Sequence, residues 1–209
     1  PRFENALLLT CREGDPGSRA AAIDALGFRR QDPGEILDDA LRVAECDESI
    51  AALRCAGRLG AERARSAAEA HAGSDHPRLA ATAVTALARI DAERGRRRCV
   101  DLLSAAEEPD PELVYLLGAI GEATDIPMLI GWLPLEGIAS RQAAVALGFM
   151  GHLQAVSPLI EILNRPDRAG VATFALRQMF GADTLADELL ALPGGHAEEE
   201  HESEAAGEE

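Results

Sequence analysis

Residues 143–151 read Ala143-Ala144-Val145-Ala146-Leu147-Gly148-Phe149-Met150-Gly151, and segments of the same kind recur on both sides of them. When Leu147 is taken as the anchor of this segment, six anchors stand 30, 31, 30, 30 and 29 residues apart. They are Leu26, Ala56, Leu87, Leu117, Leu147 and Leu176. A nearly constant period of this length is the signature of a repeat architecture, in which each repeat stacks on its neighbours.

The columns around the anchor predict an amphipathic helix in every repeat. Four positions before the anchor stand Ala22, Ala52, Ala83, Leu113, Ala143 and Ala172, and one position after it stand Gly27, Gly57, Ala88, Gly118, Gly148 and Arg177. At 100° per residue, the offsets −4, −3, 0 and +3 share one helix face, which is typical of a helix that buries one side. The small residue at +1 is expected to let a neighbouring backbone approach closely.

Helix ends are marked at several places. Asp110-Pro111-Glu112 has the order N-cap, first-turn proline and first-turn acid, and we expect Ser18 and Ser140 to act as comparable caps. Three glycines four positions after the anchor suit the left-handed residue that ends a helix, namely Gly60, Gly121 and Gly151.

A second, weaker apolar helix precedes each anchor helix, so the chain is expected to form six helix pairs. Their predicted ranges are 3–12/17–29, 34–46/48–59, 62–72/77–91, 95–107/111–120, 125–133/138–150 and 155–164/168–180, followed by a closing helix at about 183–191. Residues 1–192 are thus predicted to form one α-solenoid domain. Residues 193–209 are predicted to be a disordered acidic tail, because they are rich in Gly, Glu and His and have no apolar face.

The composition favours helices over strands and membrane spans. The 209 residues include 40 alanines and only seven aromatic residues, and alanine is a strong helix former that is depleted in strands. Every apolar run is short, so no transmembrane helix is predicted. The first ten residues lack the layout of a signal peptide, and there is no initiator methionine, so the chain is expected to be a trimmed form or a fragment.

The charge argues against nucleic acid and membrane partners. The 20 basic residues are all arginine, the 36 acids give a net charge of −16, and seven of those acids are glutamates of residues 193–209. The remaining −9 belongs to residues 1–192, and a field of that sign repels phosphate backbones and anionic lipids. The four cysteines have no C-x-x-C spacing, which favours reduced thiols and a cytoplasmic location.

The repeated Ala-Leu-Gly segment resembles the short HEAT-like repeats of bacterial proteins, and the likeness covers nearly all of residues 3–181. Arg30, Ala88 and Arg177 depart from its glycine positions. The resemblance implies an all-α, right-handed α-solenoid of about six helical hairpins, and it specifies the fold better than the function. The stretch from Val171 to Asp183, with the acidic tail after it, is also similar to HEAT-repeat proteins associated with type VI secretion.

Three activities known among HEAT-like proteins find little support in the residues. Iron-binding relatives use symmetric His-Glu pairs, whereas the single His-Glu dipeptide is His201-Glu202 in the tail, so we expect no metal site. DNA glycosylases need a basic groove, and the one basic run, at Arg94 and Arg96–Arg98, is interpreted as a solvated helix start, with a docking patch as the alternative. Bilin lyases need a polar pocket, for which no motif is present. No catalytic motif occurs, so no enzyme and no cofactor are predicted, and Cys55 is interpreted as a buried small residue.

The most informative columns are those that should not be buried. Offsets −2 and +2 lie on the face opposite the core direction, yet they hold four of the seven aromatic residues. The predicted partner-binding ridge consists of Arg54, Arg58, Arg89, Tyr115, Phe149, Phe28 and Phe174. In HEAT-like solenoids the second helices line the concave surface, and exposed Tyr, Phe and Arg are typical of binding hot spots. The alternative is that superhelical curvature buries the end positions, Phe28 and Phe174; Trp132 is expected in the core.

The sequence therefore predicts a non-enzymatic, protein-binding scaffold or adaptor that uses its concave face. Its expected partner is a protein or peptide with basic or amphipathic elements. A sharper form of this hypothesis places it in a bacterial secretion or effector cassette. The competing hypothesis is a lyase-type or other small-molecule-binding subunit.

Overall fold

The computed structural model describes residues 2–42 and 46–181, and all regular elements in that part of the chain are helices. The α-helices are α1 (Arg2–Glu13), α2 (Pro16–Phe28), α3 (Glu35–Ala40), α4 (Cys46–Leu59), α5 (Arg65–His71), α6 (Pro77–Ile90), α7 (Ala92–Ala105), α8 (Pro111–Ile120), α9 (Ile126–Trp132), α10 (Ile138–Met150), α11 (Val156–Leu163) and α12 (Ala169–Phe180). Short 3-10 helices, η1 (Glu62–Ala64), η2 (Ala123–Asp125) and η3 (Leu153–Ala155), precede α5, α9 and α11. None of the described helices has the length and apolar character needed to cross a bilayer.

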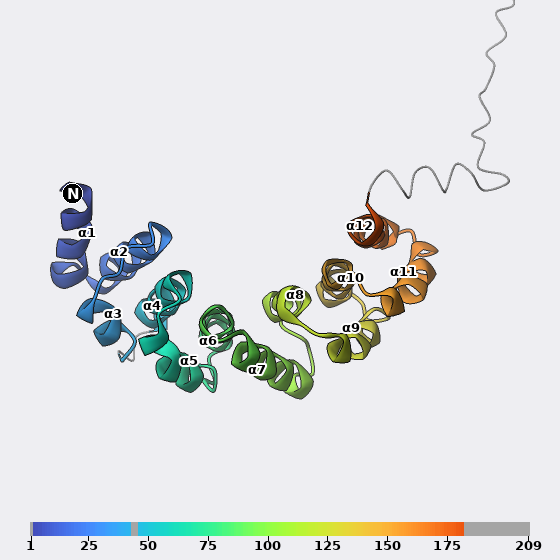
Figure 1. Cartoon of the computed structure of the whole chain (residues 1–209), viewed down its shortest axis with the longest axis horizontal. Coiled ribbons are helices and arrows are strands. Elements are labelled where there is room, and N and C mark those ends of the chain that lie inside the picture. The colour runs from blue at the N-terminus through green and yellow to red at the C-terminus, as the bar shows by residue number, and fades with distance from the viewer. Residues whose placement is uncertain (1, 43–45, 182–209) are drawn as a thin grey trace, which may run out of the picture.

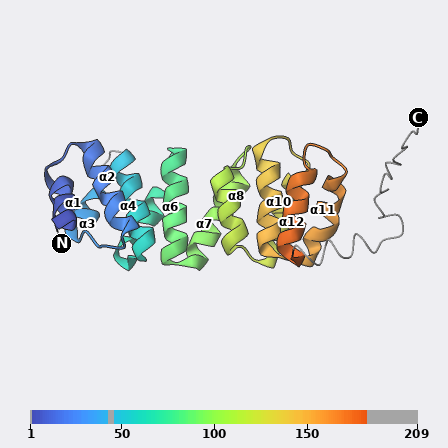
Figure 2. The same ribbon diagram turned by 90° about the horizontal axis from the view of Figure 1, so that it is seen from above.

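The helices form a curved row with two layers (Figure 1). The even-numbered helices from α2 to α12 lie on the inner, concave side of the arc, and α3, α5, α7, α9 and α11 lie on its outer side. Figure 2 shows the even-numbered helices lying side by side when the row is seen from above. Each helix packs mainly on its neighbours in the chain or in the row.

The core follows the columns that the sequence predicts. All six anchors are buried, and so are all six residues four positions before them. Leu26, Leu87, Leu117 and Leu147 are among the largest fully buried side chains. The amphipathic pattern of the second helices is therefore confirmed. Trp132 is only partly buried, and it packs against this core.

The glycine after the anchor explains how closely neighbouring inner helices approach. A Cβ atom on Gly27 would lie 2.6 Å from Cys55 Cα, and one on Gly148 would lie 2.7 Å from Ala175 Cα. Gly57 and Gly118 meet Ala86 and Ala146 in the same way, at 2.9 and 2.5 Å. In each pair the glycine contacts the residue before the next anchor, which is Cys or Ala. The small side chains of this sequence are thus a packing requirement between repeats.

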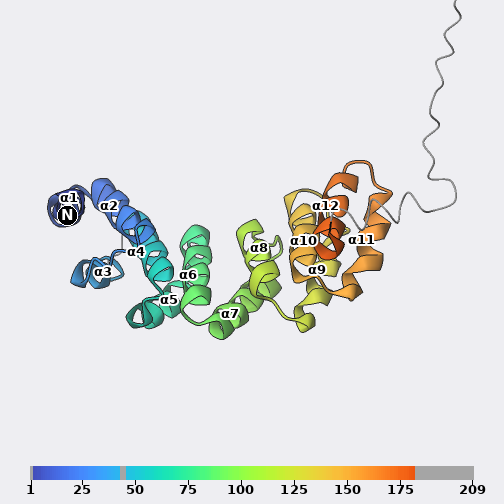
Figure 3. The same ribbon diagram turned by 45° about the horizontal axis from the view of Figure 1, so that its top comes forward.

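One junction in the row differs from the others. In α6 the position after the anchor is Ala88, and it packs on α7 instead of α8: a Cβ on Gly95 would lie 2.2 Å from Ala88 Cα. Helices α6 and α8 consequently pack less closely than the other inner neighbours, and α7 crosses between them (Figures 2 and 3). The inner row is therefore divided into an N-terminal stack (α2, α4 and α6) and a C-terminal stack (α8, α10 and α12).

Some predicted helix ends are confirmed and others are wrong. Asp110 caps α8, because its carboxylate accepts hydrogen bonds from the backbone N–H groups of the first turn at 2.8 and 3.3 Å. Ser18 is not a cap: Asp15 caps α2 and accepts the Ser18 N–H at 3.0 Å. Ser140 lies inside α10 and is buried, and its hydroxyl donates to the Leu133 carbonyl at 2.7 Å. Both serines sit one turn too late to cap.

Of the three glycines predicted to be left-handed, two are and one is not. Gly60 and Gly151 both have φ of +63°, as expected of residues that end helices. Gly121 has φ of −71°, because the chain there turns directly into the η2 segment with extended geometry. Arg30, which stands in the same column, has φ of +55° and is the one non-glycine residue with positive φ among the described residues.

The predicted helix pairs agree with the observed helices to within a few residues, with one larger difference. The helix predicted at 34–46 ends at Ala40, where Leu41 and Arg42 tighten into a turn through hydrogen bonds to Leu37 and Asp39. The predicted closing helix at 183–191 and the predicted disordered tail at 193–209 lie outside the described residues.

Candidate functional site

The seven residues of the predicted ridge lie on the inner helices, with their side chains largely outside the core. Phe28, Tyr115, Phe149 and Phe174 are 79%, 40%, 49% and 43% exposed, respectively. Arg54 and Arg89 are exposed, and Arg58 is half-buried. The exposure that the periodicity predicts is thus confirmed for six of the seven residues, including the two end positions that curvature could have buried, whereas Arg58 is half-buried. Their role in binding a partner stays a prediction.

In the C-terminal stack the ridge is aromatic. The rings of Tyr115 on α8 and Phe149 on α10 pack at a centroid distance of 6.2 Å and an angle of 51°. Phe174, on the adjacent helix α12, lines an open hollow together with Thr173 and Arg177. Three successive inner helices therefore present aromatic side chains that are each between 40% and 49% exposed.

In the N-terminal stack the ridge is basic, and one of its arginines is held firmly. The Arg58 guanidinium lies 2.5 Å from an Asp24 carboxylate oxygen and 5.7 Å from the centroid of the Phe28 ring. These contacts join α4 to α2 and orient Phe28. Arg54 and Arg89, in contrast, form no ion pair with any described residue.

The arginines of the N-terminal stack surround a hollow on the inner face. Arg54, Arg58 and Arg89 line a space of about 160 Å³ between α4 and α6. Arg58 and Arg89 also line an adjoining hollow, together with Phe28 and Arg30. Gly57 lets α4 and α6 approach closely beside this hollow, since a Cβ on it would lie 2.9 Å from Ala86 Cα. Glu112 stands at the edge of the first hollow and is its one acidic lining residue.

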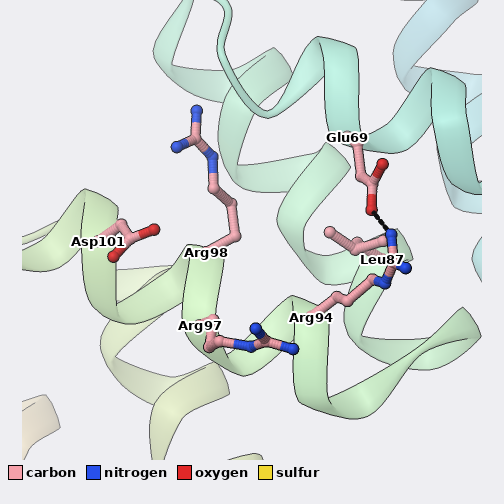
Figure 4. A pocket seen from close by; sticks show the side chains of 6 residues that line it. All are labelled: Glu69, Leu87, Arg94, Arg97, Arg98 and Asp101. Atoms are coloured by element: carbon pink, nitrogen blue, oxygen red, sulfur yellow. Dashed lines mark hydrogen bonds and ion pairs between the residues drawn. The ribbon is translucent and has the colours of Figure 1, made fainter.

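The basic run at Arg94–Arg98 lies on α7, in the outer layer, and its charges are engaged within the chain. Arg94 pairs with Glu69 at 2.5 Å, and its pKa is raised by that hydrogen bond (Figure 4). The Arg96 guanidinium lies 3.0 Å from both carboxylate oxygens of Asp125, which likewise raises its pKa. The prediction of a solvated helix start is therefore wrong for Arg96, whose side chain is 16% exposed and ties α7 to η2. Arg94 lies in the first turn of α7 with a 49% exposed side chain, as predicted, although it also pairs with α5.

The remaining arginines of this run have partners as well. Arg97 pairs with Glu93 at 3.2 Å, and Arg98 donates to the Ala72 carbonyl at 3.3 Å. Arg94, Arg97 and Arg98 line a hollow of about 420 Å³ with Glu69 and Asp101 (Figure 4). With acids on its wall and its guanidinium groups already paired, this hollow is a weaker anion site than the inner-face cluster.

The described cysteines are packing residues. Cys11, Cys55 and Cys99 are free and buried, and burial raises the pKa of Cys55 and of Cys99 to about 12. Such thiols are protonated near neutral pH and are poor nucleophiles. The interpretation of Cys55 as a buried small residue is confirmed, since it packs against Gly27. Within the described residues, no group of three or more His, Cys, Asp or Glu side chains could hold a metal ion.

Two features of this surface escape sequence reasoning. The periodicity does not separate Arg54 and Arg89, which form no ion pair with a described residue, from Arg96, which pairs with Asp125, 29 residues later in the chain. Arg30 stands in the column where other repeats have glycine, and this difference in the sequence could have indicated its left-handed backbone. The structure also places Arg30 beside Arg58. Compared with protein-family models and with curated proteins, the chain matches none.

Proposed function

We propose that this chain is a non-enzymatic, protein-binding scaffold or adaptor that holds a protein or peptide along its concave face. In this proposal the curved row is a right-handed α-solenoid of about six HEAT-like hairpins. The observation that carries the proposal is the exposed Tyr115–Phe149 pair, with ring centroids 6.2 Å apart on adjacent inner helices.

Aromatic side chains in this setting are well suited to binding. Each lies on a helix whose opposite face is fully buried, so its backbone is fixed before a partner arrives. Tyr and Phe lose few rotatable bonds on binding and bury a large area, which is why such residues dominate binding energies. Rigid, curved rows of helices offer long concave surfaces for extended or helical partners.

The chemistry of the surface favours an amphipathic partner. Apolar residues of that partner would pack on Tyr115, Phe149 and Phe174, and basic residues would be attracted by the net charge of −16. The same charge disfavours nucleic acid. A cytoplasmic location and a place in a bacterial secretion or effector cassette belong to this proposal as its most specific form.

Selection from a displayed peptide library against the immobilised chain tests the proposal. Peptides that bind should lose at least about 100-fold in affinity for a Tyr115→Ala/Phe149→Ala variant, because two central aromatic residues are removed. A Leu153→Ala/Ile160→Ala variant is the matched control, since both side chains are exposed and lie on η3 and α11 of the outer layer. Equal binding by wild type and both variants would contradict the proposal, and a coloured ligand that co-purifies would favour the small-molecule alternative.

A further inference from the structure

We infer that the arginine cluster on the inner face of the N-terminal stack, Arg30, Arg54, Arg58 and Arg89, binds the glutamate-rich C-terminal segment of this same chain, residues 193–209. The inference goes beyond the proposed function, because it assigns an occupant to a different part of the concave face and needs no external partner. Some arginines of the molecule form ion pairs with described acidic side chains and others do not.

Several arginines elsewhere on the row have acidic partners within the chain. Arg63 pairs with Asp32 and Asp38, and Arg94 pairs with Glu69 and Asp91. In the inner cluster only Arg58 has such a partner among the described residues, namely Asp24. Arg30, Arg54 and Arg89 thus gather around two adjoining hollows without an ion pair to any described residue, and Glu112 is the one acidic residue that lines these hollows. The chain as a whole has a net charge of −16.

Arg30 combines an unusual backbone conformation with a place beside the second hollow. Its φ of +55° is the left-handed conformation that the same column reaches with glycine at Gly60 and Gly151. A side chain at a left-handed position is disfavoured by contact between Cβ and the backbone. Retaining arginine there adds a positive charge to the hollow that Phe28, Arg58 and Arg89 line, so a strained residue and a charge cluster coincide.

The segment at 193–209 has the complementary charge. It contains seven glutamates and no lysine or arginine. A separate acidic molecule would approach against the net charge of the chain, whereas a tethered segment meets the cluster at an effective concentration of about 1 mM or more. Individually weak, exposed Arg–Glu pairs are then sufficient to keep the segment on the cluster for part of the time.

The length of the chain permits this contact. Neighbouring helices lie about 10 Å apart and the α6–α8 step is wider, so α4 is more than about 40 Å from α12 along the inner row. From residue 182 to Glu209 the 28 residues reach about 76 Å, at about 1.5 Å per residue over the helix predicted at 183–191 and about 3.3 Å per residue elsewhere. A segment bound at the cluster would have to pass the aromatic side chains of the C-terminal stack. A partner bound at Tyr115 and Phe149 would therefore compete with the segment for space.

NMR spectra of the 15N-labelled full-length chain test the inference without any partner. The readout is the amide resonances of Gly194, Gly195 and Gly207, compared with those of a synthetic peptide covering residues 193–209. At about 20 mM salt we expect the resonances of the full chain to differ from those of the peptide, and at about 0.5 M salt to coincide with them, because salt screens exposed ion pairs. Coincidence at low salt would overturn the inference.

Two independent sets of substitutions locate the contact. Arg54→Glu/Arg89→Glu should move the glycine resonances to their peptide positions at low salt, whereas the control Arg12→Glu/Arg165→Glu, which changes two exposed arginines outside the cluster, should leave them displaced. Neutralising Glu198–Glu200 with glutamine should act like the first variant without touching the folded part.

The remaining outcomes are equally decisive. Displacement that grows with protein concentration would show that the segment binds a second copy, and it would overturn binding within one chain. Equal effects of the cluster variant and its control would show that only net charge matters, which also contradicts the inference. A Tyr115→Ala/Phe149→Ala variant should retain the displaced resonances, so failure of the proposed function and failure of this inference are distinguishable.

Discussion

The N-terminal stack presents Arg54, Arg58 and Arg89 on its inner face, whereas the C-terminal stack presents Tyr115 and Phe149 in the same columns of the repeat. Both stacks bury the same anchor and small-residue columns. Packing between the helices therefore constrains the residue types only at the buried positions of the repeat. The columns at offsets −2 and +2 are free to differ, and they give one stack a basic surface and the other an aromatic one.

Helix α7 connects these two stacks, and it does so through two different kinds of contact. Gly95 packs against Ala88 of α6 in the N-terminal stack. Arg96, the next residue, reaches Asp125 of η2, which leads into the C-terminal half. A substitution at Gly95 should therefore affect the contact of α7 with α6, and loss of the Arg96–Asp125 pair should affect its contact with η2.

The largest expected effect is at the α6–α7 contact. Gly95→Ala should lower the free energy of unfolding by about 3 kcal/mol, because the new Cβ would lie 2.2 Å from Ala88 Cα and both backbones must shift. Gly131→Ala is the matched control: it is a helical glycine with no atom within 4 Å of the new Cβ, and it should stabilise α9 by about 0.5–1 kcal/mol. Urea unfolding followed by circular dichroism measures both. Equal effects would show that the close approach at Gly95 is not a constraint.

The opposite side of the junction should respond less. Asp125→Ala removes the carboxylate that accepts from Arg96 and from the Glu122 N–H, and we expect a loss of about 2 kcal/mol, since Asp125 is 5% exposed. Arg42→Ala breaks an ion pair with Asp39 whose side chains are 75% and 77% exposed, and it should change stability by less than about 0.5 kcal/mol. The same unfolding curves decide this, and a similar loss in both variants would contradict the role given to Asp125.

The rate at which the Cys55 thiol is chemically labelled tests whether the two stacks unfold independently of each other. The pKa of Cys55 is raised by burial to about 12, so at pH 8.5 the folded thiol is protonated and reacts only when opening returns its pKa to about 8.5. Gly57→Ala, in the same stack, should speed labelling of Cys55 about 10-fold, corresponding to about 1.4 kcal/mol. Gly148→Ala, in the C-terminal stack, should change it less than about 2-fold.

Labelling is read by mass spectrometry of the peptide that contains Cys55 after cleavage at Arg54, which separates it from Cys11, Cys46 and Cys99. If Gly148→Ala speeds the labelling of Cys55 as much as Gly57→Ala does, the row unfolds as one unit and the division into two stacks has no energetic meaning.

The smallest stability effect is expected at Arg30. Arg30→Gly should raise the free energy of unfolding by about 0.5–1 kcal/mol, because glycine adopts the observed φ of +55° without a Cβ contact. Arg30→Ala is the control, since it removes the charge and keeps the strain, and it should leave stability nearly unchanged. Thermal melting of the three proteins compares them, and a destabilised Arg30→Gly variant would show that the arginine side chain holds the turn.

Much of the fold could be predicted from the sequence because its determinants are local. The anchor period, the alanines before it and the Asp110-Pro111 helix start each act within one helix pair. Ser140 could not be predicted, since its hydroxyl is committed to Leu133 and also accepts from Arg168, which comes 28 residues later in the chain. The junction depends on a single contact between Ala88 and Gly95, which the repeat pattern does not contain.

In the candidate site, too, the local features could be predicted from the sequence and the contacts between repeats could not. The exposure of Tyr115, Phe149 and Phe28 follows from their angle to the core direction, and the sequence alone provides that angle. The charges that remain available for a ligand do not follow from it, since ion pairs such as Arg96–Asp125 form between repeats. Asp15 shows a missed local signal, because Asp15-Pro16 has the same pattern as the Asp110-Pro111 helix start.

The most direct test of the account combines stability and binding in the Tyr115→Ala/Phe149→Ala variant. Because the two rings are 40% and 49% exposed, we expect its melting temperature to stay within about 3 °C of wild type. Its affinity for peptides selected on the wild-type chain should fall at least about 100-fold, while the Leu153→Ala/Ile160→Ala variant binds them as wild type does. A large loss of melting temperature, or unchanged affinity in a folded variant, would contradict the claim that this aromatic surface exists for binding.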